Sequence, residues 1–219
     1  MQRHKYARAA GYDAEQYWHD RLGRHGRSLR GPGREARSEA ENIADYAAAA
    51  DGFRECCREE GLDLRGAAVL DIGCANGFYA GLCRDAGVRS YSGVDITDVL
   101  FPDLAGQFRR FRFLKRDVTS DRLEGVFDVV LMIDVVEHIV TEQQLDVAME
   151  NVRRVLTSGG VFVLGMPSGK RWARWLFHVH CWREADITRR LPGFTAGGSR
   201  PFRDGRIFAF RKHAPEGPT

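Results

Sequence analysis

The sequence lacks an apolar run of membrane-spanning length, and its first ten residues are polar and basic rather than a secretory signal. We therefore expect a soluble, cytoplasmic protein without membrane contact. Only five residues are cysteine, and no two of them form a CxxC pair. This usage argues against a disulfide framework and suits a reducing compartment.

No internal repeat or low-complexity block divides the chain, and its 219 residues fit one domain with a sizeable core. Within that domain we expect three parts. Residues 1–60 would form an N-terminal lid and a leading helix. Residues 61–213 would form the core, and residues 214–219 a tail.

The net charge of +3 conceals a segregation along the chain. Residues 1–40 hold 9 Lys and Arg against 5 Asp and Glu, residues 41–167 hold 13 against 21, and residues 168–219 hold 11 against 4. An acidic core is therefore flanked by two basic segments. The simplest interpretation is a solvated surface; in the functional one, both ends cover a cleft and present arginines to an anionic or phenolic molecule.

The stretch VLDIGCANGFYAGL, residues 69–82, predicts a buried strand, a glycine turn and the start of a helix. Glycine permits tight turns, and the free N–H groups at a helix N-terminus attract polar ligands. Three more strand-like segments follow, and they end near Asp95, Asp117 and Asp134. Four acidic strand ends predict one cleft along the carboxyl edge of a sheet.

The regular alternation of strands and helices predicts an α/β fold, in which right-handed crossovers force parallel pairing. We expect a doubly wound, Rossmann-like, mostly parallel sheet with an antiparallel edge strand, here 206–212, and helices on both faces. The expected helices are residues 13–21, 38–60, 78–86, 99–108, 141–156 and 183–191. In the second of these, Ser38 and Glu41 form a capping box, and Ile43, Tyr46, Ala47, Ala50 and Phe53 share one face.

In order and spacing, these four motifs resemble those of class I S-adenosylmethionine-dependent methyltransferases over residues 65–169. Within that superfamily the chain is similar to small-molecule enzymes such as quinone-biosynthesis O-methyltransferases. The resemblance implies a methyltransferase whose cofactor is S-adenosylmethionine and whose product is S-adenosylhomocysteine. It also implies that the glycine turn holds the methionine end, the second acid the ribose, and the third motif the adenine. The cofactor-binding residues implied are Tyr17, Asp71, Gly73, Cys74, Gly77, Asp95, Ile96, Asp117, Val118 and Ile133.

The turn departs from the family pattern, because Ala75 stands where glycine is usual. Alanine fits there if its φ stays negative, with Asn76 free to adopt a left-handed conformation where one is needed. We therefore expect a permitted variant of the turn.

The resemblance places the chemistry at the exit of the fourth strand, where His138 is the candidate general base and His180 a second catalytic candidate. The D/E-x-x-E-H arrangement of Asp134, Glu137 and His138 also resembles a divalent-metal site that His180 could complete. The V-x-E-H motif is, however, widespread in metal-free relatives. We therefore expect no metal.

The leading hypothesis is methyl transfer to an oxygen or nitrogen of a small-molecule metabolite, by a monomer or homodimer. Nucleic acid is not the expected partner. An RNA 2′-O-methyltransferase is the alternative, which the E-H pair and the basic ends support and which would need a basic track with stacking aromatics. A cofactor-binding protein that no longer methylates is a further alternative.

Overall fold

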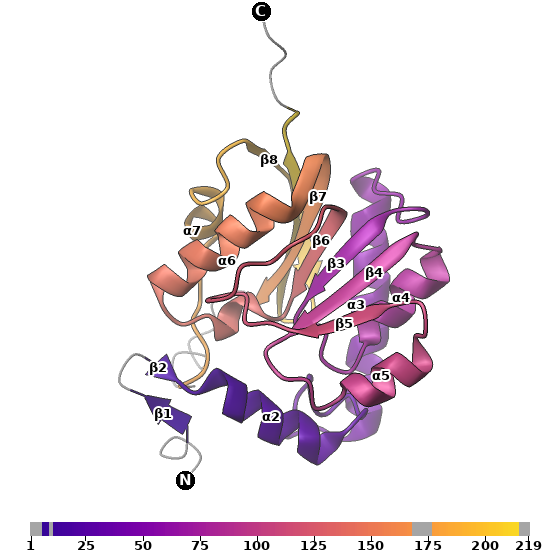
Figure 1. Ribbon diagram of the computed structural model, residues 1–219, viewed down its shortest axis with the longest axis vertical. Coiled ribbons are helices and arrows are strands. Elements are labelled where there is room, and N and C mark those ends of the chain that lie inside the picture. The colour runs from indigo at the N-terminus through magenta and orange to yellow at the C-terminus, as the bar shows by residue number, and fades with distance from the viewer. Residues whose placement is uncertain (1–5, 9–10, 168–176, 215–219) are drawn as a thin grey trace, which may run out of the picture.

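The computed structural model describes residues 6–8, 11–167 and 177–214. Its main feature is a seven-stranded sheet in the order β5-β4-β3-β6-β7-β9-β8 (Figure 1). The strands are β3 (Ala68–Ile72), β4 (Ser90–Asp95), β5 (Arg112–Lys115), β6 (Phe127–Ile133), β7 (Leu156–Pro167), β8 (Phe194–Phe202) and β9 (Gly205–Lys212). A separate pair, β1 (Ala7–Arg8) and β2 (Gly11–Tyr12), is antiparallel.

The fold class predicted from the sequence is confirmed, since β3 to β7 are parallel and β9 is antiparallel to both of its neighbours. The position of the last strand was predicted wrongly. Strand β9 is not at the edge of the sheet, because residues 194–202 pair with it as β8. That segment contains Gly197, Gly198 and Pro201, which are unusual inside a strand but tolerated at an edge.

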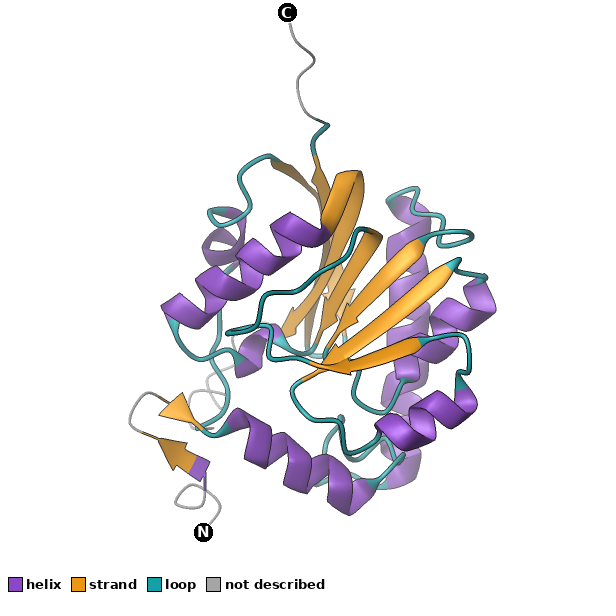
Figure 2. Cartoon of the chain, viewed as in Figure 1, coloured by secondary structure: helices purple, strands orange, loops and turns teal. Residues whose placement is uncertain are grey.

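Helices cover both faces of the sheet (Figure 2). They are α2 (Ala14–His25), α3 (Glu39–Glu59), α4 (Phe78–Ala86), α5 (Phe101–Gln107), α6 (Glu142–Val155) and α7 (Glu184–Thr188), with a short 3-10 turn η1 (Val136–His138). Successive residues of the central strands point to opposite faces, so that Leu70 packs with α6 residues and Val69 with residues of α3 and α4. Apolar side chains on both faces are what parallel strands require.

The expected boundaries hold for α4, and those of α3, α5 and α6 shift by one or two residues. The capping box before α3 is confirmed, because Ser38 N donates to Glu41 Oε2 at 2.8 Å and Glu41 N donates to Ser38 Oγ at 3.2 Å. The predicted buried face of this helix was partly wrong. Ile43 is 54% exposed and Ala47 is exposed, while Asn42 is fully buried.

Helix α2 runs past the carboxyl ends of the parallel strands, whereas the other helices lie against the faces of the sheet (Figure 1). Its N-cap, Asp13, accepts a hydrogen bond from Gln16 N at 3.0 Å. The helix is one turn longer than expected and ends at His25 before Gly26. Among the described residues, no helix is long and apolar enough to cross a membrane. The division of the chain at residue 60 stays a prediction.

Candidate active site

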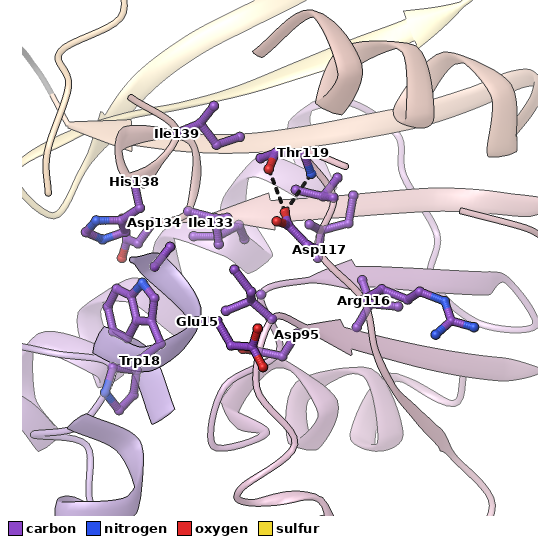
Figure 3. A pocket seen from close by; sticks show the side chains of 18 of the residues that line it. Glu15, Trp18, Asp95, Arg116, Asp117, Thr119, Ile133, Asp134, His138 and Ile139 are labelled. Atoms are coloured by element: carbon purple, nitrogen blue, oxygen red, sulfur yellow. Dashed lines mark hydrogen bonds between the residues drawn. The ribbon is translucent and has the colours of Figure 1, made fainter. Parts of the chain in front are cut away.

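A cavity of about 450 Å³ lies between the carboxyl ends of the central strands and helix α2 (Figure 3). Its floor comes from the strand ends and the loops that follow them, and its cover comes from the start of α2. The residues from the sequence prediction that line it are Gly73, Asp95, Ile96, Asp117, Val118, Ile133 and His138. Pockets of this size hold small molecules and cofactors.

The turn after β3 has three residues in the left-handed region: Gly73 at φ +80°, Ala75 at φ +43° and Gly77 at φ +79°. The expectation that Ala75 keeps a negative φ was therefore wrong. The Asp95 carboxylate compensates for the strain, because its Oδ2 accepts a hydrogen bond from Ala75 N at 2.9 Å.

The two glycines of this turn are required by packing as well as by backbone conformation. A Cβ on Gly73 would lie 2.2 Å from Val135 Cγ2, and one on Gly77 would lie 2.5 Å from Leu104 Cδ2. Gly77 is the N-cap of α4. Of these two, only Gly73 also lines the cavity.

Two carboxylates reach the cavity from the ends of β4 and β5. Asp95 is buried, and Oδ1 accepts from Thr97 N at 3.2 Å. Burial raises the pKa of Asp95 to about 6, although the backbone hydrogen bonds oppose the shift. Asp117 Oδ1 accepts from both the amide and the hydroxyl of Thr119, at 2.8 and 2.7 Å (Figure 3).

Four of the predicted cofactor residues, Tyr17, Asp71, Cys74 and Gly77, are not among the described residues that line the cavity. Asp71 is buried behind the turn, where its Oδ2 accepts a 2.5 Å hydrogen bond from the Tyr91 hydroxyl. Burial raises the pKa of Asp71 to about 7, the Tyr91 hydrogen bond lowers it, and the nearby charge of Asp95 raises it. In this position Asp71 orients the turn from behind.

Beyond β6, Asp134 adopts φ +56° and forms an ion pair with Arg203 from the turn between β8 and β9. The Arg203 guanidinium also lies 4.6 Å from the centroid of the Tyr46 ring. Asp134 and Tyr46 both line the cavity. The ion pair therefore connects the C-terminal hairpin to the wall of the site.

The imidazole of His138 faces the cavity beside Trp18 of α2, with ring centroids 4.8 Å apart (Figure 3). Nδ1 lies 2.9 Å from the backbone carbonyl oxygen of His178. Because a carbonyl oxygen only accepts, Nδ1 carries the proton and Nε2 has a free lone pair. Desolvation lowers the pKa of His138 to about 3, so that the ring is neutral at pH 7.

His180, the second catalytic candidate, lies apart from His138. Its side chain is exposed and rests on the Trp182 ring, with centroids 3.9 Å apart. Its backbone N–H donates to Glu137 O at 2.7 Å. His180 is not among the described residues that line the cavity.

The arrangement at the exit of β6 does not favour the metal site considered above. Asp134 is paired with Arg203, and His138 Nδ1 with a carbonyl group. Glu137 is buried, and Oε2 has no hydrogen-bond partner in the described structure. Burial raises the pKa of Glu137 to about 8, so that much of it is protonated at pH 7. Across the described ranges, no three His, Cys, Asp or Glu side chains are grouped to hold a metal.

Not all aromatic residues of the lid line the cavity. Tyr12 and Trp18 line the cavity, whereas Tyr17 does not and instead lies 3.3 Å from His178 Nε2 through its hydroxyl. The sequence predicts a lid within residues 1–60 but gives no basis for choosing among its aromatic residues. The segment from residue 169 to residue 182 is predicted to lie over the acceptor side, and residues 169–176 of it lie outside the described residues.

One lining residue, Tyr79, was not predicted from the sequence. Its hydroxyl is buried and has no hydrogen-bond partner in the described part of the chain. The sequence did offer a signal for this residue. Tyr79 is a polar aromatic residue in the first turn of the helix after the glycine turn, at the helix end where N–H groups are free.

Comparison with protein families matches a model described as "Methyltransferase domain" to residues 40–196. No curated protein matches the chain. Among solved structures, magnesium protoporphyrin IX methyltransferase from Synechocystis PCC 6803, with bound S-adenosylhomocysteine, aligns with a TM-score of 0.71. The two share 19% identity, and the alignment covers 90% of this chain and 97% of the other.

Two further structures have the same fold. N-methyltransferase NodS from Bradyrhizobium japonicum WM9, in complex with S-adenosylhomocysteine, has a TM-score of 0.59 and 20% identity, over 74% of this chain and 87% of its own. A S-adenosylmethionine-dependent methyltransferase from Clostridium acetobutylicum has a TM-score of 0.64 and 16% identity, over 77% and 92%.

Proposed function

The chain belongs to the methyltransferase domain family, whose cofactor is S-adenosylmethionine, and we propose that it methylates an oxygen or nitrogen of a small-molecule metabolite. The observation that carries the proposal is the position of His138. A neutral imidazole whose Nε2 is unprotonated lines the cavity that lies over the strand ends.

The residues of the cavity fit this cofactor. Asp95 is a buried carboxylate that can accept from ribose hydroxyls, and Ile96, Val118 and Ile133 supply apolar surface for a base. Asp117 can accept from an exocyclic amine. Tyr79, whose buried hydroxyl has no hydrogen-bond partner among the described residues, offers a donor that a bound polar ligand would satisfy. When bound, the cofactor supplies an electrophilic methyl group on a sulfonium.

The chain's own contribution to transfer is to orient the acceptor and to remove its proton. His138 Nε2 is the atom that would take the proton, because Nδ1 is already protonated and bonded to His178 O. Desolvation lowers the pKa of His138, so that the ring is neutral throughout the neutral range. Tyr12 of β2 and Trp18 of helix α2 cover the site and limit its access to water.

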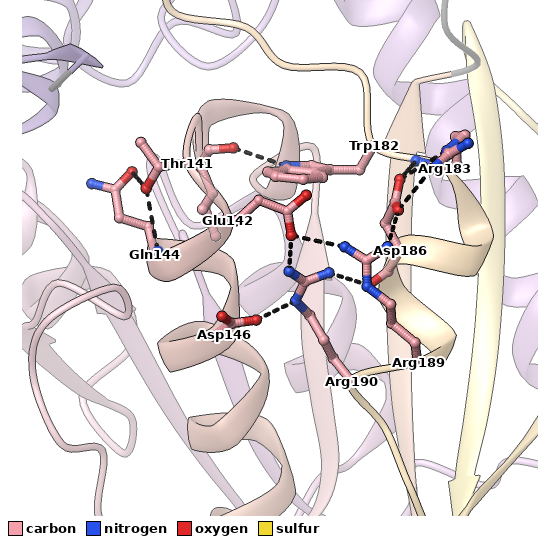
Figure 4. Close-up of polar contacts among 10 residues, drawn as sticks. Thr141, Glu142, Gln144, Asp146, Trp182, Arg183, Asp186, Arg189 and Arg190 are labelled. Carbon is pink, nitrogen blue, oxygen red and sulfur yellow. Dashed lines mark hydrogen bonds and ion pairs between the residues drawn. The ribbon is translucent and has the colours of Figure 1, made fainter.

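A small acceptor is supported by how the arginines of the basic ends are used. Arg24 pairs with Glu35 at 2.8 Å and Arg37 with Asp45 at 2.8 Å. Near the other end, Arg190 Nε pairs with Asp146 at 2.5 Å and Arg189 Nη2 with Glu142 at 2.7 Å (Figure 4). These charges are partly neutralised within the protein, which reduces their availability to an RNA backbone.

The test is an assay of methyl transfer to a panel of phenols, other alcohols and amines, with methylated products and S-adenosylhomocysteine detected by mass spectrometry. We expect turnover of at least one acceptor by the wild type. In His138→Phe, which keeps an aromatic ring but lacks the base, the rate should fall by about 100-fold or more. The matched control is His213→Phe at the exposed C-terminal end, for which we expect wild-type turnover.

Undiminished turnover in His138→Phe would contradict the role of this base. A wild-type protein that binds the cofactor but methylates no member of the panel would favour a non-catalytic binding protein.

A further inference from the structure

The segment that holds the His138 base in place is itself attached to the lid helix. Tyr17 on α2 lies with its hydroxyl 3.3 Å from His178 Nε2, and the two ring centroids are 4.7 Å apart. The Tyr17 hydroxyl also accepts a 2.9 Å hydrogen bond from Arg21 Nη1. Arg21 is fixed in turn, because Nη2 donates to Gly33 O at 2.5 Å. The lid therefore presents an oriented hydroxyl to His178.

His178 transmits this contact to the site through its backbone. Its carbonyl oxygen lies 2.9 Å from His138 Nδ1, and the two imidazole rings are stacked at 5.5 Å with an interplanar angle of 10°. The same short segment is anchored at its far end, where Trp182 Nε1 donates to Ile139 O at 2.8 Å (Figure 4). At the other end of this segment, next to the site, Tyr17 of the lid contacts His178.

We propose that Tyr17 is a positioning residue for the reaction, which holds His178 so that its carbonyl keeps the proton of His138 on Nδ1. The inference rests on the proposed function, since it assigns Tyr17 a role in preparing the base. This role differs from the one predicted from the sequence, in which Tyr17 binds the cofactor.

The physical reason is that a neutral imidazole has two tautomers and only one of them can act here. With the proton on Nδ1, Nε2 can take a proton from an acceptor. With the proton on Nε2, that atom is a donor and no longer a base. The His178 carbonyl selects the first tautomer, and one hydrogen bond is enough to favour it by about tenfold.

The lid thereby links closure to the state of the base. When α2 lies over the cavity, the Tyr17 hydroxyl is in reach of His178, and the carbonyl is held over His138. Without the Tyr17 contact, the segment from residue 177 to residue 182 is still held by Trp182, but His178 beside the site is no longer held by the lid. The base would then be fully prepared only under the closed lid.

The test compares Tyr17→Phe with the wild-type protein by long-range 1H–15N NMR spectra of the histidine rings, with His138 assigned from His138→Phe. In the wild type we expect His138 in the Nδ1–H form. In Tyr17→Phe we expect a mixture of the two tautomers. Once an acceptor is known, kcat should fall by about three- to tenfold, while the cofactor Kd changes by less than about twofold.

The matched control is Tyr6→Phe, in which a hydroxyl of the same aromatic cluster is lost. Tyr6 packs edge-to-face on Tyr17 at 5.3 Å, but its hydroxyl donates to Asp20 at 2.7 Å. We expect its spectrum and kcat to match the wild type. A second variant, His178→Gln, keeps the carbonyl but removes the ring that meets Tyr17, and it should shift the tautomers as Tyr17→Phe does.

The proposal is overturned if His138 stays in the Nδ1–H form in both Tyr17→Phe and His178→Gln, or if the tautomer shifts while kcat does not. Because the spectra need no acceptor, they test the proposal even if the proposed methyl transfer fails. A fall in kcat that Tyr6→Phe shares would show only a general effect on the aromatic cluster, and would also overturn it.

Discussion

The backbone amide of Ala75 donates a 2.9 Å hydrogen bond to Oδ2 of Asp95, and so ties the turn after β3 to the end of β4. The residue that the bond holds is a non-glycine residue at φ +43°. Asp95 therefore has a structural role in the turn beside its proposed role toward the cofactor. This double use explains how alanine is accommodated at a position where glycine is conformationally easier.

Ala75→Gly should stabilise the protein. The left-handed conformation costs alanine about 1–2 kcal/mol, which glycine would not incur. Part of the resulting gain in stability is offset by the greater flexibility of glycine in the unfolded chain. We expect a net gain of about 0.5–1 kcal/mol and a rise in Tm of a few degrees, measured by thermal unfolding. Ala105→Gly, on the exposed side of α5, is the control and should destabilise by a similar amount. A loss of stability in Ala75→Gly would contradict the assignment of strain.

Asp71 should make stability depend on pH. Its pKa is raised to about 7 in the folded protein, from an ordinary value of 3.8, so the folded state binds the proton more tightly than the unfolded state. The stability it contributes is complete below about pH 4 and is lost as pH rises through about 7. In Asp71→Asn, which can still accept from Tyr91, this loss is absent.

We therefore expect Asp71→Asn to gain stability relative to the wild type between about pH 4 and pH 8, by on the order of a few kcal/mol. Urea unfolding at several pH values measures the difference. A constant difference across this range would show that Asp71 has an ordinary pKa in the folded protein.

The ion pair between Arg203 and Asp134 should stabilise the fold mainly by compensating a half-buried carboxylate. Arg203→Met keeps a long side chain near Tyr46 but leaves Asp134 unpaired. The Asp134 side chain is still 30% exposed, so we expect a loss of about 2 kcal/mol, less than for a fully buried pair.

The double variant Asp134→Asn/Arg203→Met should recover at least half of that loss, because asparagine is uncharged and tolerates a left-handed φ. Denaturant unfolding of the wild type, both single variants and the double variant gives the coupling energy. If the double variant is as unstable as the sum of the single ones, the two side chains do not interact.

The fold and the floor of the site could be predicted because their signals are local. A buried strand, a glycine turn and an acid at the strand end each involve a few neighbouring residues, and parallel pairing then brings the strand ends together. Asp95 and Asp117 were predicted in this way and line the cavity, as does His138, which was predicted from the family resemblance. The same reasoning could not separate Asp71, which points behind the turn toward Tyr91, from the acids that face the cavity.

What could not be predicted depends on contacts between distant segments. Asn42 is buried in α3 in place of Ile43 because it serves the loop before the helix, where it accepts from Arg34 N and donates to Arg34 O. Strand β8 forms at residues rich in glycine because β9 offers it an edge. Tyr17 meets His178 across 161 positions of sequence. No period or motif in the sequence records these pairings.

The most direct test of the cofactor site is isothermal titration of the protein with S-adenosylmethionine and S-adenosylhomocysteine. We expect micromolar binding by the wild type and by Asp103→Asn, an exposed acid on α5, and binding at least about tenfold weaker in folded Asp95→Asn. If the folded wild type binds neither ligand, or if Asp95→Asn binds both as tightly as the wild type, the assignment of this cavity as the cofactor site is contradicted.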